Sequence, residues 1–90
     1  MDNLSRIFEK LKIAVNELKS SIDNISFKDI CNTVKLFGFQ QRAGKGSHVI
    51  FSRKDIYQML NFQDVKGKAK PYQIRQFIKL IDKYKLMERL

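Results

Sequence analysis

The sequence predicts an α+β fold in which a three-stranded antiparallel sheet carries helices on one of its faces. Apolar side chains recur at helical spacing near both ends of the chain, and the middle alternates apolar and polar residues between glycine-containing turns. The 90 residues are enough for one domain with a modest core. A small α+β layer of this kind leaves the second face of the sheet free for a ligand.

The first helix is expected over residues 4–20. Its apolar stripe consists of Leu4, Ile7, Phe8, Leu11, Ala14, Val15 and Leu18. This stripe packs either on the rest of the domain or on a second copy of the chain, and the mixed charge of the polar face disfavours a membrane surface. Residues 1–25 are therefore interpreted as a helical extension of a domain over residues 26–90, the two forming one compact unit.

A second helix is expected to begin after Ser26, with Asp29 placed for a weak capping box, and to end at Gly38. Its buried stripe consists of Phe27, Ile30, Cys31, Val34 and Phe37. Cys31 is the only cysteine, so no disulfide can form within the chain, and we expect it to be a small core residue.

The sheet is expected to follow this helix. The predicted strands cover residues 39–42, 47–53 and 57–63, joined by turns at 43–46 and 52–56. In the second strand the two-residue period separates Val49 and Phe51 from His48 and Ile50. If the first pair faces the helices, His48 points away from the core.

The last helix is expected over residues 71–84, with Pro71 in its first turn. Its buried stripe consists of Ile74, Phe77, Ile78, Ile81 and Tyr84. The preceding residues 64–70 are expected to form a polar loop that carries three lysines at alternate positions.

The charge of the chain is uneven. The net charge is +9, from 18 basic and 9 acidic residues. Residues 1–37 hold six basic and five acidic side chains, whereas residues 38–90 hold twelve and four. This asymmetry favours a polyanion as the partner of the second part, with nucleic acid ahead of a membrane surface, although a solvated surface would have the same composition.

The candidate binding residues gather around His48, the only histidine. Lys45 lies in a glycine-rich turn that can approach a phosphate, and Lys66, Lys68 and Lys70 precede a helix N-terminus, which favours anions. The polar ends of Tyr57, Tyr72 and Gln73 are expected to reach bases or sugars, and Arg75 follows them on the helix. Each of these three groups also has a purely structural interpretation. The turn with Lys45 can be a plain hairpin turn, the three lysines can lie in a solvated loop, and the two tyrosines and Gln73 can serve ordinary packing.

Several kinds of site are excluded or disfavoured. One Cys and one His cannot form a zinc site within one chain, and neither a Ser-His-Asp arrangement nor paired carboxylates are apparent. Any catalysis is therefore expected to need no metal or other cofactor. It would use His48 to move a proton while the RNA 2′-hydroxyl supplies the nucleophile. No apolar run suits a signal peptide or a membrane span, so a reducing cytoplasm is expected.

Two segments resemble the HicA family of bacterial toxins, the RNA-cleaving members of HicA–HicB toxin–antitoxin pairs. They are Gly46-Ser47-His48-Val49-Ile50-Phe51 and Gly67-Lys68-Ala69-Lys70-Pro71-Tyr72-Gln73-Ile74-Arg75-Gln76. The resemblance covers about residues 27–84. It implies a fold like a double-stranded-RNA-binding domain and a ribosome-independent mRNA endonuclease with one essential histidine, which His48 matches.

The resemblance also implies a separate HicB antitoxin that binds the toxin and covers its active site in the bacterial cytoplasm. Minimal members begin near residue 27, so residues 1–25 are an addition whose role stays open between added core, antitoxin contact and self-association through residues 4–20. A non-catalytic RNA-binding module with the same fold is the second interpretation.

Overall fold

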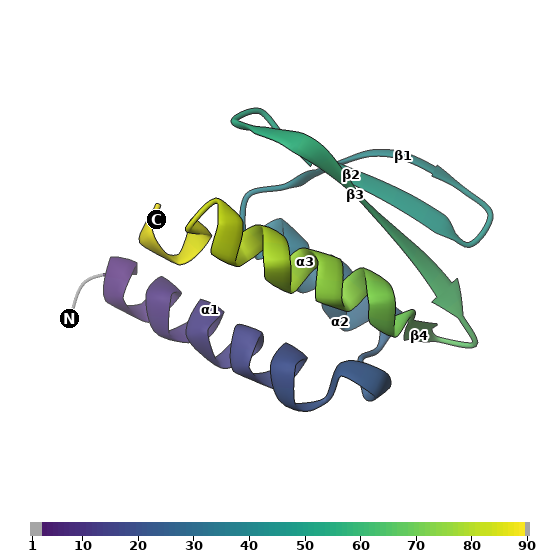
Figure 1. The fold of residues 1–90 in the computed structure, drawn as a ribbon, viewed down its shortest axis with the longest axis horizontal. Helices are drawn as coiled ribbons and strands as arrows, with labels where there is room; N and C mark the ends of the chain where they lie inside the picture. The colour runs from purple at the N-terminus through teal and green to yellow at the C-terminus, as the bar shows by residue number, and fades with distance from the viewer. Residues whose placement is uncertain (1–2, 90) are drawn as a thin grey trace.

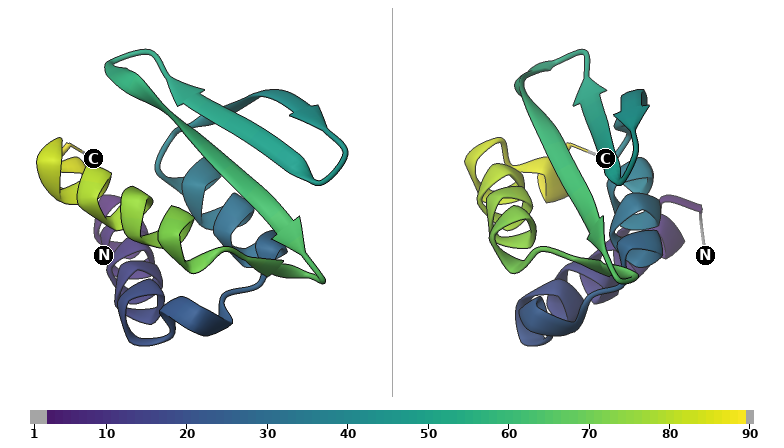
Figure 2. Two further views of the ribbon diagram at one scale, coloured as in Figure 1. Left: turned by 45° about the vertical axis from the view of Figure 1, so that its right-hand side comes forward. Right: turned by 90° about the vertical axis from the view of Figure 1, so that its right-hand side faces the viewer.

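The chain folds into three layers, which a computed structural model describes for residues 3–89 (Figure 1). An antiparallel sheet forms the first layer, α2 and α3 cover one of its faces, and α1 lies beyond these two helices (Figure 2). In chain order the elements are α1 (Asn3–Ser20), η1 (Ile22–Asn24), α2 (Phe27–Leu36), β1 (Gln40–Lys45), β2 (His48–Arg53), β3 (Ile56–Val65), β4 (Lys68–Ala69), α3 (Pro71–Lys83) and η2 (Leu86–Glu88). The predicted α+β class, with helices on one face, is confirmed.

The helix boundaries follow the predicted local signals. The Ser26 hydroxyl accepts a hydrogen bond from the Asp29 backbone N–H at 3.0 Å, which caps α2. Gly38 has φ of 87°, the left-handed conformation that lets the chain turn away after the helix. Arg53 Nη1 donates to the Phe37 carbonyl at 2.8 Å and so holds β2 against the end of this helix.

The sheet has four strands in the order β1-β2-β3-β4, so the prediction of three is wrong. The expected polar loop at 64–70 instead contains the end of β3, a two-residue turn and the short strand β4. Lys66 and Gly67 both have positive φ, as a tight turn of type I′ requires. The Asp64 carboxylate accepts from the Gly67 N–H at 2.7 Å, and the Gly67 carbonyl accepts from the Phe27 N–H.

The first hairpin is also tighter than expected. The predicted turn at 43–46 shrinks to Gly46 and Ser47, because Gly44 and Lys45 pair with Val49 and His48 as part of β1. Gly46 has φ of 62°, which matches the first central position of a type II′ turn. The turn therefore places His48 at the first residue of β2, paired with Lys45.

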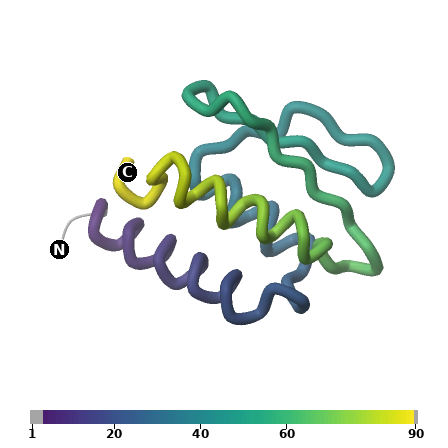
Figure 3. Tube along the Cα trace, in the orientation of Figure 1, coloured from purple at the N-terminus to yellow at the C-terminus, as the bar shows by residue number. Residues whose placement is uncertain are grey.

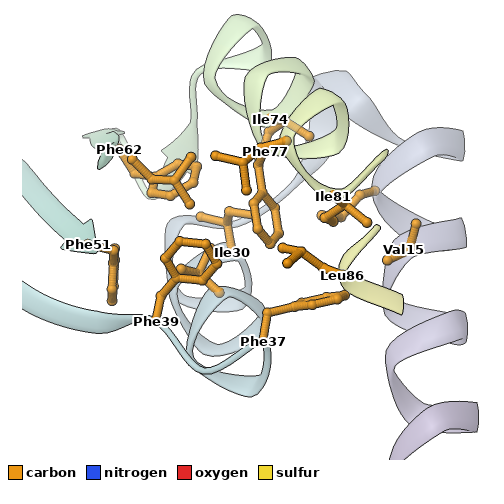
Figure 4. Close-up of a cluster of buried hydrophobic side chains, with 14 of the residues drawn as sticks. Val15, Ile30, Phe37, Phe39, Phe51, Phe62, Ile74, Phe77, Ile81 and Leu86 are labelled. Carbon is orange, nitrogen blue, oxygen red and sulfur yellow. The ribbon is translucent and has the colours of Figure 1, made fainter. Parts of the chain in front are cut away.

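One continuous core joins all three layers (Figure 4). The ring of Phe77 lies at its centre and makes edge-to-face contacts with Phe37, Phe39 and Phe62, with ring centroids 5.6 to 6.3 Å apart. Leu86, in η2, is also fully buried. The end of the chain thus returns to pack beside α1, as the trace in Figure 3 shows.

The N-terminal helix packs on its own domain along half of its length. Leu11, Val15 and Leu18 belong to the common core, whereas the earlier apolar residues Leu4, Ile7 and Phe8 are exposed. The packing of α1 on the rest of the domain is therefore confirmed for its second half. Self-association through residues 4–20 stays a prediction that concerns the first half.

Cys31 packs against the core, as predicted, and burial raises the pKa of its thiol above the ordinary value. At neutral pH the thiol is therefore protonated and weakly nucleophilic. Among the residues that the structure describes, no helix has the length and apolar character needed to cross a bilayer.

Candidate nucleic-acid interface

His48 lies on the face of the sheet that the helices leave uncovered. Phe51 is fully buried and Val49 is partly buried against the core, whereas His48 is exposed. Since successive side chains on a strand point to opposite faces, His48 shares the outer face with Ile50. The prediction that His48 points away from the core is confirmed.

The strand register places polar side chains beside this histidine. His48 pairs with Lys45 of β1 on one side and with Gln63 of β3 on the other. Residues that face each other across strands project to the same side of the sheet. Lys45, His48 and Gln63 therefore form a row across three strands on the outer face.

The fourth strand extends this row with two lysines. Lys68 pairs with Val65, which shares the face of Gln63 by the two-residue period. Lys70 follows β4 in extended conformation, and the register continued by one residue places it beside Gln63. We call this surface the open face; it consists of Lys45, His48, Ile50, Asn61, Gln63, Val65, Lys68 and Lys70.

The start of α3 lies at the end of the open face. Lys70 occupies the N-cap position without a side-chain cap, and Pro71 begins the helix. Pro71 has no N–H and the Gln73 N–H donates to the Lys70 carbonyl at 3.0 Å, so this end of the helix offers an anion the Tyr72 N–H and the positive end of the helix dipole. Tyr72 is exposed in this first turn, and Lys70 Nζ lies 5.9 Å from the centre of its ring.

The prediction that Gln73 contacts RNA is wrong, because Gln73 is an interior residue. Its side chain is only 3% exposed, and its Oε1 accepts from the Gln63 backbone N–H at 2.8 Å. Its Nε2 donates to the Tyr72 hydroxyl at 3.3 Å. With both ends of the amide engaged, Gln73 cannot reach RNA, and it instead ties the first turn of α3 to the strand beside His48.

The other predicted residues divide into near and remote ones. Lys66 lies in the β3–β4 turn and projects from a left-handed backbone position at the same end of the sheet as the β1–β2 turn (Figure 1). Arg75 is exposed in α3, after the first turn. Tyr57 is remote, because it begins the opposite end of β3, about 20 Å from Gln63 at strand spacing.

The sequence analysis missed the polar residues of β3. Asn61 and Gln63 lie on the open face opposite Ile50 and His48. The signal was present, because Leu60 and Phe62 were expected to point inward and alternation then places Asn61 and Gln63 outward. The amide side chains are donors and acceptors for the edges of bases and for sugar hydroxyls.

The electrostatics of the open face are cationic. The ion pairs among residues 3–89 join Arg53 and Arg89 to Asp55, so within this range no carboxylate forms an ion pair with His48 or with the lysines of the open face. Asp64 is instead engaged by the Gly67 N–H. In the same part of the chain, no three His, Cys, Asp or Glu side chains form a group able to hold a metal ion.

Fold and site together define a small α+β domain with one exposed, basic sheet face. Comparison of the chain with known protein families, with curated proteins and with solved structures finds no match. A concentration of lysines on one face, with amide side chains among them and an exposed tyrosine at its end, is a feature that nucleic-acid-binding surfaces share.

The hydrogen bond from the Gln63 N–H to the side chain of Gln73 can be tested directly by substitution. Replacing Gln73 by leucine leaves the Gln63 N–H without its buried acceptor, which costs about 1–3 kcal/mol of unfolding free energy. We expect the melting temperature to fall by several degrees, since about 1 kcal/mol shifts a domain of this size by roughly 4–8 °C. Gln76→Leu, at an exposed position of the same helix, is the control and should melt like the parent. Equal melting of the two variants would contradict the structural role of Gln73.

Proposed function

We propose that this chain is a metal-independent RNA endonuclease of the HicA toxin type, which cleaves mRNA and so inhibits translation and growth. The observation that carries the proposal is the position of the single histidine, exposed on a lysine-rich open face. The resemblance around Gly46–Phe51 and Gly67–Gln76 supports the same assignment, with a fold of the double-stranded-RNA-binding type as its finer description.

The proposed reaction is a transesterification at a phosphodiester of RNA. The 2′-oxygen attacks phosphorus, the bond from phosphorus to the 5′-oxygen breaks, and a 2′,3′-cyclic phosphate and a 5′-hydroxyl result. One proton leaves the 2′-hydroxyl and one reaches the departing 5′-oxygen. His48 acts as general base, general acid or both in turn, since imidazole exchanges protons close to neutral pH.

The cationic residues hold the backbone of the substrate. Lys45 and Lys70 lie in one row with His48, and Lys66 and Lys68 lie at the adjoining turn and strand. Their charges stabilise the negative charge that develops on the phosphoryl oxygens in the transition state. In the same scheme the exposed ring of Tyr72 stacks on a base or contacts a sugar, and Arg75 binds a phosphate further along.

As a HicA-type toxin, the chain would work in the bacterial cytoplasm and be neutralised by a separate HicB-type antitoxin. An antitoxin that covers the active site must lie on the open face, because His48 is exposed there. It would thereby exclude mRNA from the same lysines.

The test of the proposal is cleavage of RNA by the purified protein in the presence of EDTA, followed by analysis of the product ends. We expect a 2′,3′-cyclic phosphate, or the monophosphate formed by its hydrolysis, and a 5′-hydroxyl. Products with a 5′-phosphate, formed only when a divalent metal is added, would contradict the mechanism. A DNA strand of the same sequence is the control and should stay intact, since it has no 2′-hydroxyl.

A non-catalytic RNA-binding module is the second candidate, and one observation favours it. Within the described residues no carboxylate forms an ion pair with His48, although a general base is commonly oriented by such a partner. This module would bind RNA with an affinity that falls steeply with salt, as counterion release requires, and would leave the RNA uncut. Binding without cleavage in the same assay would therefore select this function.

A further inference from the structure

Strand β3 has an outer edge that is only partly used. On its inner side it pairs with β2, but on its outer side β4 pairs only with Asp64 and Val65. The next N–H along this outer edge, that of Gln63, donates to the Oε1 of Gln73. From Ile56 to Asn61, no strand among residues 3–89 pairs with this outer edge.

The direction of the backbone groups along this edge follows from two hydrogen bonds. The Asp64 N–H points inward to the Ser47 carbonyl, and the Gln63 N–H points outward to α3. The two-residue period of the strand therefore directs the N–H and C=O groups of Asn61 outward. The Leu60 N–H then points inward to β2, so the C=O of Met59, which shares its peptide group, points outward where the register between β2 and β3 becomes irregular. Such a row of main-chain groups is a template for one more strand.

A groove lies along this edge, between the first half of β3 and the second half of α3. It has a volume of about 720 Å³ and is lined by Tyr57, Gln58, Met59, Leu60, Gln76, Lys79, Leu80 and Lys83. Leu60 and Leu80 are core residues at its floor, whereas Tyr57 and Met59 are 96% and 67% exposed. Apolar side chains this exposed beside an open strand edge are typical of a surface that a partner covers.

The charge of the groove indicates which class of partner it binds. Its lining contains Lys79 and Lys83 and no acidic residue. A second copy of this chain would bring two more lysines to the same place, and like charges disfavour that pairing. RNA would satisfy the lysines but not the main-chain N–H and C=O groups and the apolar side chains together.

We propose that the β3 edge groove binds an extended acidic segment of another protein, which adds to the sheet as a fifth strand beside β3. Main-chain hydrogen bonds to Met59 and Asn61 provide affinity, as in other cases of strand addition. Alternate side chains of the segment then pack on Leu60 and Leu80, and its carboxylates reach Lys79 and Lys83. This inference does not depend on the proposed nuclease function, because the groove and His48 lie at opposite ends of β3.

The experiment is a titration of the full ¹⁵N-labelled chain with an acetylated peptide of about eight alternating glutamate and valine residues, the length of an ordinary strand. We expect the amide signals of Met59 and Asn61 to shift and the exchange of the Asn61 N–H with solvent to slow. The same peptide with lysine in place of glutamate is expected to cause no shift. Absence of shifts with the acidic peptide, or shifts on the open face with none at Met59, would overturn the proposal.

Two charge-reversed variants separate the groove from general attraction to a basic protein. Lys79→Glu with Lys83→Glu is expected to weaken peptide binding at least about tenfold. Lys12→Glu with Lys19→Glu makes the same change of charge on exposed positions of α1 and should leave the affinity within about twofold. Equal weakening in both variants would overturn the proposal.

A backbone variant and an RNA titration complete the test. Asn61→Pro removes one outward N–H at an unpaired edge, where proline is tolerated, and should weaken peptide binding while the remaining amide spectrum stays dispersed. Unchanged binding by this variant and by the Lys79 and Lys83 variant would overturn the proposal. Shifts at Tyr57 and Met59 with an RNA oligonucleotide, and none with the peptide, would instead assign the groove to RNA.

Discussion

Replacing His48 by alanine abolishes RNA cleavage and toxicity while leaving the protein folded, if the proposed mechanism holds. A positioned general acid or base contributes about 10²–10⁴-fold to a rate, so the loss is expected in this range or larger. The fold should tolerate the change because His48 is exposed and its side chain lies outside the core. The melting temperature of the variant should therefore match that of the parent.

The measurement is growth and full-length mRNA after induction from a tightly repressed promoter, together with RNA cleavage by the purified protein. Lys12→Ala, at an exposed position of α1, is the matched control and should remain toxic. Cleavage that survives in the His48→Ala variant would assign the chemistry to other residues. RNA binding by both forms, with cleavage by neither, would favour the RNA-binding module.

Replacing Phe77 by alanine is expected to cost most of the stability of the domain. Its ring is fully buried and contacts Phe37, Phe39 and Phe62, so the change removes apolar contacts that join α3 to the segment between α2 and β1 and to β3. Truncation of a buried phenylalanine costs about 3–5 kcal/mol. Since the free energy of unfolding of a small domain is about 5–15 kcal/mol, this variant should be largely or wholly unfolded.

Urea unfolding followed by circular dichroism measures this loss as a lower midpoint. Tyr57→Ala is the matched control, because it removes an aromatic ring that is 96% exposed. Its midpoint should lie within a few tenths of a molar of the parent, given slopes of about 1–3 kcal/mol per molar urea. A midpoint for Phe77→Ala close to that of Tyr57→Ala would show that the aromatic cluster does not hold the layers together.

The three long helices and the orientation of His48 could be predicted because their signals are local. An apolar stripe needs only the 3.6-residue period of one segment, as in the stretch from Leu11 to Leu18. The cap at Ser26 joins groups three residues apart, and Gly38 adopts its conformation within its own turn. The two-residue period of β2 likewise decides which face His48 takes once Phe51 is assigned to the core.

Strand β4, the role of Gln73 and the burial of Leu86 depend on contacts with other segments, whereas the outward position of Asn61 and Gln63 follows from the local period of β3. Strand β4 has only two residues, and it is stabilised by pairing with the end of β3 and by the Ala69 N–H donating to the Ile25 carbonyl. Gln73 has an amide side chain of the kind that contacts RNA. In the fold, however, its Oε1 accepts the hydrogen bond from the Gln63 N–H, which has no partner on a neighbouring strand. Leu86 joins the core only because the chain returns to α1.

Periodicity therefore determined the helices, the α+β class and the surface on which the candidate site lies. Packing determined which of the candidate residues are free to act there. It left His48, Lys45, Lys66 and Lys68 exposed, Lys70 half-buried and Gln73 buried, and it left the outer edge of β3 open beside Lys79 and Lys83. The physical reason is that a backbone hydrogen-bond donor buried away from water must find a partner within the fold, whereas an exposed donor can bond to water. That partner is chosen by neighbours in space, which residue spacing along one segment does not encode.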